Sequence, residues 1–147
     1  METGIKHLHS FWAYLVLFIT LIATINAIAG TVSKKPFAAK DAKLALFALI
    51  ATHIQFLVGI VLFFVSPLGI KNIKASGMGV VMKDSLMRLY AVEHPLVMLI
   101  AVVLITIGYS AHKRKTLDSQ KFKTIMIFYL IALILMLSRI PYAVWFS

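Results

Sequence analysis

The chain alternates four long apolar runs with short polar connections. Each run is close to the roughly 20 residues that a helix needs to cross about 30 Å of hydrocarbon at about 1.5 Å per residue. Because the runs are continuously apolar rather than alternating, they favour helices over the strands of a barrel. The runs are Phe11–Ala29, Leu44–Val65, Leu89–Tyr109 and Phe122–Val144. They predict an all-α protein with transmembrane helices over about 11–29, 44–65, 87–110 and 122–144.

The connections predict how these helices are arranged. They are short, so neighbouring helices should be antiparallel, giving a single four-helix domain over 1–147 with up-down-up-down topology. The first run is long for a signal sequence, and we expect it to be retained. Segment 70–84 is too short to cross the membrane and return, so we expect it to lie at the membrane surface. Asp84 or Ser85 is then expected to cap the third helix.

Composition agrees with a membrane protein, because 61% of residues are hydrophobic and 14% are charged. The net charge of +10 lies in membrane-flanking segments, so it does not indicate nucleic-acid binding. Nine basic residues fall in the first and third connections and six on the side of the termini. This excess predicts that the termini are periplasmic, in a bacterial inner membrane. The absence of cysteine excludes c-type haem attachment, thiolate-ligated iron–sulfur clusters and disulfides.

Two histidines lie inside the apolar runs. His53 is near the middle of the second run and His94 is just inside the third. Ionisable groups at membrane depth are costly and often functional, so we expect these two to be axial ligands of haem b. His9, just before the first predicted helix, is the alternative ligand. Run midpoints place His53 and His94 about 10 Å apart in depth at about 1.5 Å per residue, which leaves the pairing and one or two haems open.

Other residues fit around such a haem. Arg88 and Arg139 lie nearer the terminal side, where propionates would reach the interface, and Tyr90 precedes His94 by one turn. Glu93 is expected to neutralise one of these arginines, or alternatively to relay protons. Pro95 can kink the helix beside His94.

Plainer interpretations of the histidines also exist. Buried histidines can simply hydrogen-bond neighbouring helices, and Thr52 and Gln55 are possible partners of His53. His7 and His9, with a methionine or His94, would suit copper by ligand type. We expect His7 and His112 to be solvated.

Four segments resemble a family of small bacterial four-helix membrane proteins labelled cytochrome b-like. They read LHSFWAY at 8–14, THIQ at 52–55, RLYAVEHP at 88–95 and SRIP at 138–141. The resemblance covers essentially the whole chain and implies a haem-associated inner-membrane protein with His9, His53 and His94 as the matching histidines. The chain is also faintly similar to one four-helix half of haem A synthases, in which paired helices ligate haem.

We therefore expect electron transfer within or beside a respiratory complex, with lipid and a larger membrane complex or quinone as partners, rather than a free-standing enzyme. The alternative is a cofactor-free accessory subunit that packs on such a complex. For it, Ala23, Ala27 and Gly30 form a small-residue stripe that could contact a partner helix. A third hypothesis is a membrane enzyme or transporter that moves protons through Glu93 and the histidines.

Overall fold

The computed structural model describes residues 1–145, and this part of the chain is helical with no strand. The long helices are α1 (Glu2–Ser33), α2 (Ala39–Val65), α6 (His94–Lys113) and α7 (Asp118–Ser138). The short ones are α3 (Ile70–Ser76), α4 (Met78–Lys83), α5 (Ser85–Arg88), the π-helical η1 (Leu89–Glu93) and α8 (Tyr142–Trp145). Helices α5, η1 and α6 follow one another as a single helical segment over Ser85–Lys113. The prediction of an all-α, four-helix bundle is confirmed.

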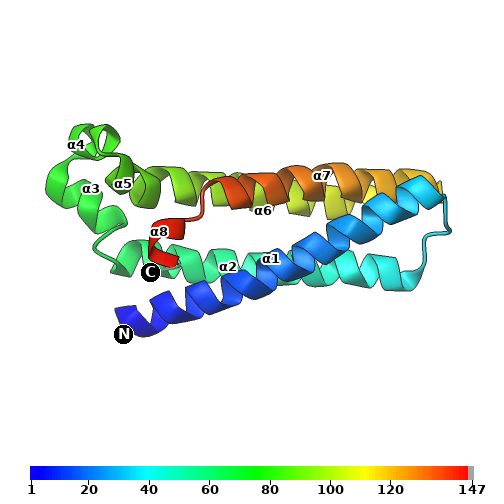
Figure 1. The fold of residues 1–147 in the computed structure, drawn as a ribbon, viewed down its shortest axis with the longest axis horizontal. Coiled ribbons are helices and arrows are strands. Elements are labelled where there is room, and N and C mark those ends of the chain that lie inside the picture. The colour runs from blue at the N-terminus through cyan, green and yellow to red at the C-terminus, as the bar shows by residue number, and fades with distance from the viewer. Residues whose placement is uncertain (146–147) are drawn as a thin grey trace.

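The four long helices form an antiparallel ring (Figure 1). Helix α1 packs against α2 and α7, and α6 packs against α7 and α2. Both ends of the chain lie at one end of the bundle, which also carries α3, α4 and α5 (Figure 1). We call this the terminal end, and the opposite end, with the connections over 34–38 and 114–117, the lysine-rich end.

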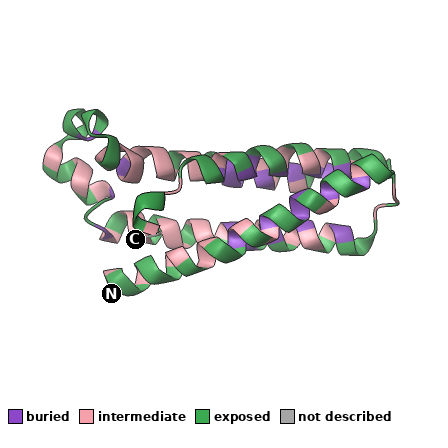
Figure 2. Ribbon diagram, in the orientation of Figure 1, coloured by how far each residue is buried: buried purple, intermediate pink, exposed green. Residues whose placement is uncertain are grey.

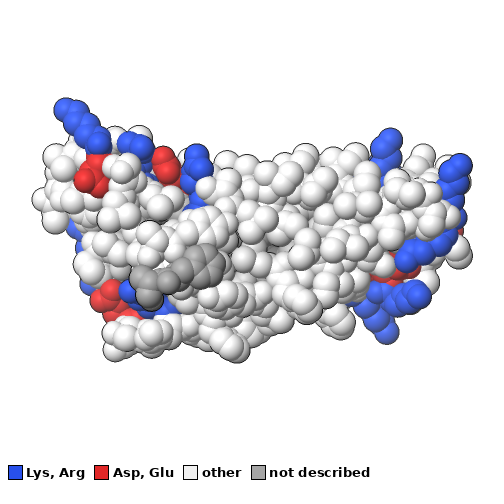
Figure 3. All heavy atoms as spheres, in the orientation of Figure 1, with Lys and Arg blue, Asp and Glu red and all other residues white. Residues whose placement is uncertain are grey.

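The surface has the charge distribution of a membrane-spanning bundle. Figure 3 shows basic and acidic side chains gathered at the two ends, with a charge-free band between them. Large apolar side chains in this band face outward, among them Phe18, Leu57 and Ile134. Four helical segments are long and apolar enough to cross a membrane. These properties are those of a multi-pass membrane protein.

The predicted bounds of the first and fourth helices were wrong. Helix α1 begins at Glu2 rather than near residue 11, so His9 lies within a helix instead of preceding one. Glu2 in the first turn favours this extension, because an anion complements the positive end of the helix dipole. Helix α7 ends at Ser138 rather than near residue 144, because Pro141 has no backbone N–H and disfavours helical geometry before it. The chain then forms the short α8.

Short helices connect α2 to α6, over the segment for which the sequence predicted only a position at the membrane surface. Gly77, with φ of 84°, separates α3 from α4 in a conformation that favours glycine. Val81 of α4 is fully buried, so this segment packs on protein as well as facing outward. The predicted cap is Asp84, whose carboxylate accepts hydrogen bonds from the backbone N–H groups of Leu86 and Met87 at 3.0 and 2.8 Å.

The bundle is tightly packed in its lysine-rich half. Buried positions on α1 begin at Val16, and those on α2 end at Thr52 (Figure 2). The core there is built of alanines packed around large residues such as Tyr129, whose hydroxyl donates to the carbonyl of Ala45 at 2.7 Å. In the terminal half most inward positions are only half-buried.

This packing uses the small-residue stripe inside the bundle. Ala23 and Ala27 are buried, and a Cβ added at Gly30 would lie 2.5 Å from the ring of Phe122. The expectation that the stripe packs against a partner protein is therefore wrong. Small residues are required here because the helices of the chain itself approach closely.

Candidate cofactor site between His9 and His94

A π-helical turn sets the position of His94. The backbone N–H of His94 bonds to the carbonyl of Leu89, five residues earlier, and Pro95 follows without an N–H to donate. Such wide turns insert one extra residue into a helix and often lie at functional sites. The turn thereby changes the direction in which His94 projects from the Ser85–Lys113 segment.

The end of α7 fixes the ring of His94. Because the helix stops at Ser138, the carbonyl of Arg139 has no helical partner, and it lies 2.7 Å from Nδ1 of His94. A carbonyl oxygen can only accept, so Nδ1 carries the ring proton. Nε2 is then left with a free lone pair. Metal-ligating histidines are commonly oriented in this way.

His9 faces His94 across the terminal half of the bundle. The two ring centroids are 6.1 Å apart and the ring planes are nearly perpendicular, at 81°. Helix α2 holds His9 in two ways. The side chain of Gln55 donates to the backbone carbonyl of His9 at 2.8 Å. One turn further on, Gly59 leaves room for the imidazole, because a Cβ there would lie 3.1 Å from Cε1 of His9.

Buried polar atoms without a partner occur at His9 and at the residue that holds it. Within residues 1–145, four buried side-chain polar atoms have no hydrogen-bond partner. They are Nδ1 of His9, Oε1 of Gln55, the hydroxyl of Tyr90 and the hydroxyl of Thr20. An unsatisfied buried group costs about 1–3 kcal/mol, and such groups in native proteins usually meet a water or a ligand. Two of the four belong to His9 and to Gln55, which holds it, and Tyr90 precedes His94 by four residues on the same helical segment.

An ion-pair cluster borders the site at the terminal end. Glu93 lies 2.9 Å from Nε of Arg88 and 3.5 Å from Nε of Arg139. Arg88 also donates to the carbonyl of Met82 at 2.7 Å. The expectation that Glu93 pairs with an arginine is confirmed. It contacts both arginines, and its single negative charge leaves the cluster with one net positive charge. The cluster ties the Ser85–Lys113 segment to the end of α7, so both arginines lie in the layer next to His94.

His53 lies elsewhere, and the hydroxyl nearest its Nε2, that of Thr106, already donates to the carbonyl of Val102 at 2.8 Å. The Nδ1 of His53 is 2.8 Å from the carbonyl of Leu49, and its Nε2 is 3.3 Å from the hydroxyl of Thr106 on α6. Thr106 is twelve residues from His94, or about 18 Å along the helix at about 1.5 Å per residue. The structure therefore brings His94 beside His9 rather than beside His53. The suggested partners of His53, Thr52 and Gln55, were wrong, because their side chains donate to the carbonyls of Ala48 and His9.

The two remaining histidines differ from each other. His7 is exposed, as expected. His112 was predicted to be solvated and is instead buried, with its ring 5.5 Å from that of Phe37 and 4.9 Å from that of Tyr109. Phe37, in the connection between α1 and α2, packs on the ring of His112. The two residues are 75 positions apart, so the sequence around His112 gives no sign of this contact.

Sequence reasoning did not assign Gln55 or Gly59 to the site. The available signal was the spacing, because a polar and a small residue four positions apart share one face of a membrane helix. Within residues 1–145, no group of three or more histidine, cysteine or acidic side chains is arranged to hold a metal ion. A haem needs only one or two axial imidazoles.

Comparison with known proteins gives no relative, since no protein-family model, curated protein or solved structure matches the chain. Its function is therefore inferred from the geometry of this site.

Proposed function

We propose that this protein binds one b-type haem between His9 and His94 and carries electrons within the membrane. The observation that supports this most is the state of His94. Its proton is held on Nδ1 by the carbonyl of Arg139, and its ring stands opposite a second histidine from another helix. This is the arrangement expected of an axial ligand with an orienting partner.

The spacing of the two imidazoles suits a shared metal centre. Histidine nitrogens bind metals at about 2 Å, so two imidazoles this close together could both reach one metal centre. The separation of their ring centroids is 6.1 Å. The unpartnered Nδ1 of His9 and hydroxyl of Tyr90 add polar groups that a bound ligand or its water would satisfy. The half-buried packing of this half leaves it less compact than the alanine-lined half.

Each residue of the site then has a definite task. His94 presents a lone pair, and the Arg139 carbonyl holds its orientation. Gln55 and Gly59 hold His9 at the matching position. Arg88 and Arg139 provide positive charge for propionates at the terminal end, and Glu93 limits the net charge of that layer. A b-type haem in such a site supplies a one-electron redox centre.

The location of the site within the membrane suggests which redox partners it would meet. A redox site between helices of the membrane-spanning region is accessible to a membrane-soluble quinone or to a neighbouring respiratory complex. We place the protein in a bacterial inner membrane with both termini periplasmic, as the excess of basic residues at the lysine-rich end favours. The resemblance of four segments to small cytochrome b-like proteins supports the same assignment.

The test is spectroscopic. The detergent-purified protein should show b-type bands in a reduced-minus-oxidised spectrum and about one haem per chain in a pyridine haemochrome assay. His94→Ala and His9→Ala should each lose most of the bound haem. His53→Ala is the matched control and should retain it. Far-UV circular dichroism of each variant verifies that the helices persist.

Other outcomes would lead to different conclusions. Loss of haem in His53→Ala with retention in His9→Ala would restore the pairing of His53 with His94. A colourless wild-type protein, even after haem is supplied during expression, would refute the proposal. The chain would then be better explained as a cofactor-free accessory subunit.

A further inference from the structure

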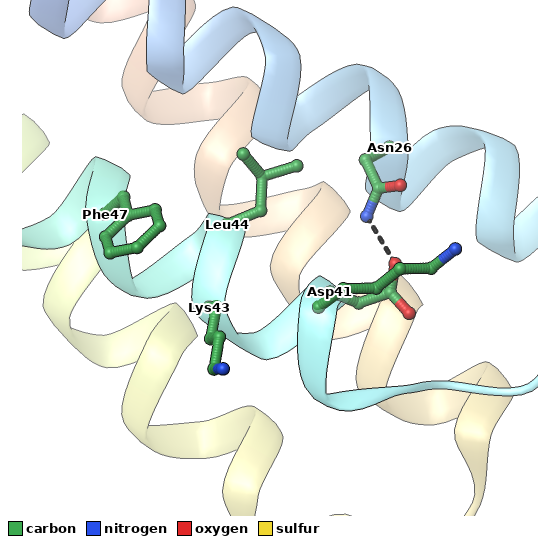
Figure 4. Close-up of a pocket in the computed structure, with 6 residues that line it drawn as sticks. Asn26, Asp41, Lys43, Leu44 and Phe47 are labelled. Carbon is green, nitrogen blue, oxygen red and sulfur yellow. Dashed lines mark hydrogen bonds between the residues drawn. The ribbon is translucent and has the colours of Figure 1, made fainter.

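Two grooves open at the lysine-rich end, away from the histidine pair. The first lies between α1 and α2 and has a volume of about 410 Å³. Figure 4 shows Asn26 approaching from α1, while Asp41, Lys43, Leu44 and Phe47 line it from α2. Lys40 completes the lining.

The second groove repeats this design on another pair of helices. It lies between α6 and α7 and also measures about 410 Å³. Lys115 contributes from the connection after α6, and Lys123 contributes from α7. Ile127 and Phe128 supply its apolar wall.

Both grooves are amphiphilic along the membrane normal. In the first, Lys40 precedes Phe47 by seven residues, or about 10 Å at about 1.5 Å per residue. In the second, Lys123 precedes Ile127 by four residues, or about 6 Å by the same rise. In each case the cations stand at the end of the bundle and the apolar residues lie deeper in the charge-free band. A phospholipid has the same order of headgroup and acyl chain.

The charges at this end are not balanced within the chain. Nine basic residues face two acidic ones there. Both carboxylate oxygens of Asp41 already accept hydrogen bonds. One accepts from the side chain of Asn26 at 2.9 Å, and the other accepts from the backbone N–H of Ala38 at 2.8 Å. The ion-pair partner of Asp41 is Lys35, at 3.8 Å, rather than a groove lysine.

Helix direction adds little to the preference for an anion. Lys40 lies in the first turn of α2, where the positive end of the helix dipole favours an anion, but Asp41 already lies in that turn. Lys43 and Lys123 are the fifth and sixth residues of their helices, and Asp118 lies in the first turn of α7. Within residues 1–145, the four groove lysines form no ion pair. They are Lys40, Lys43, Lys115 and Lys123. Asp41 lines the first groove beside Lys40 and Lys43, so the positive charge there is partly balanced, whereas no acidic side chain in the described part of the chain lines the groove of Lys115 and Lys123.

We propose that each groove binds an acidic phospholipid, with its phosphate between the paired lysines and an acyl chain along the apolar wall. Basic pockets between transmembrane helices bind acidic lipid headgroups in this way. The proposal is independent of the histidine site, because the grooves lie at the opposite end of the bundle.

Lipid retention in native mass spectrometry tests this proposal. The full chain in mixed micelles should retain two phosphatidylglycerol molecules in preference to phosphatidylcholine at equal mole fraction. Lys40→Gln with Lys43→Gln, and Lys115→Gln with Lys123→Gln, should each lose one of the two. At about 1 kcal/mol for each lysine, removal of a pair lowers affinity at that groove about 30-fold. Lys74→Gln with Lys83→Gln, two exposed lysines of the terminal end, is the control and should retain both lipids.

Three results would overturn the proposal. Equal retention of phosphatidylcholine would show that charge does not select the lipid. An equal loss in the control variant would show diffuse attraction rather than two sites. Inorganic phosphate that displaced the lipid at millimolar concentration would show an anion site without a role for the apolar walls. All four lysines are exposed, so glutamine should leave the helices intact, which circular dichroism verifies.

Discussion

Gly59 offers a sharp test of how the candidate site is built. The structure places it against the imidazole of His9, where an added Cβ would lie 3.1 Å from Cε1 and 3.7 Å from Nδ1. Ordinary van der Waals contacts begin at 3.4 Å. Gly59→Ala therefore requires His9 or α2 to move by about 0.3 Å or more, close to the tolerance of about 0.5 Å that a binding site allows.

Two opposing terms set the effect on stability. Alanine is favoured over glycine inside a helix by about 0.8–1 kcal/mol. Crowding in a packed interior costs about 1–3 kcal/mol. At Gly59 the sum lies between no change and about 2 kcal/mol of destabilisation by these estimates. At Gly4, where nothing lies within 4 Å of an added Cβ, the propensity term acts without a clash, so Gly4→Ala should be neutral or stabilising.

The effect on the site should exceed the effect on the fold. Changes to groups that orient a metal ligand typically lower affinity about 10–100-fold. For a haem bound as proposed above, we expect about a tenfold loss of affinity in Gly59→Ala. Haem titration followed by absorbance measures affinity, and thermal unfolding in detergent measures stability. A Gly59→Ala protein that binds haem as tightly as wild type, and gains as much stability as Gly4→Ala, would refute the packing of His9 on Gly59.

Three further predictions concern the lysine-rich half, each measured by thermal unfolding in detergent followed by circular dichroism. Gly30→Ala should destabilise by about 1–3 kcal/mol because its Cβ would meet the ring of Phe122 at 2.5 Å, and an unchanged midpoint would contradict that contact. Tyr129→Phe should cost about 1 kcal/mol, since it removes the hydrogen bond to the Ala45 carbonyl, and a more stable protein would speak against this bond. Asp41→Ala should cost about 1–2 kcal/mol by removing the acceptor at the start of α2, whereas no loss would show that this end of α2 is satisfied without the carboxylate.

Much of the fold was determined by local properties of the chain. The continuity of the apolar runs specified four spans, because backbone groups in lipid must be satisfied within a helix. Their short connections specified the antiparallel order. The residue types at Asp84 and Ser85 marked a cap, and the structure assigns it to Asp84. The end of α7 was predicted too late, because the apolar run continues past Pro141. The proline itself was the signal that the helix ends before it.

The histidine pairing depended on tertiary structure. Depths estimated from run midpoints left the pairing open, and His53 was preferred because it lies inside an apolar run. The structure instead extends α1 to Glu2, and this extension brings His9 opposite His94. Which imidazoles meet depends on helix rotation and tilt, and these are set by close packing such as that of Gly30 on Phe122. The sequence alone determined that the chain forms membrane helices with histidines inside them. The packing of the helices decided that His9 faces His94 while His53 lies beside Thr106, because contacts between distant segments leave no periodic signal along the chain.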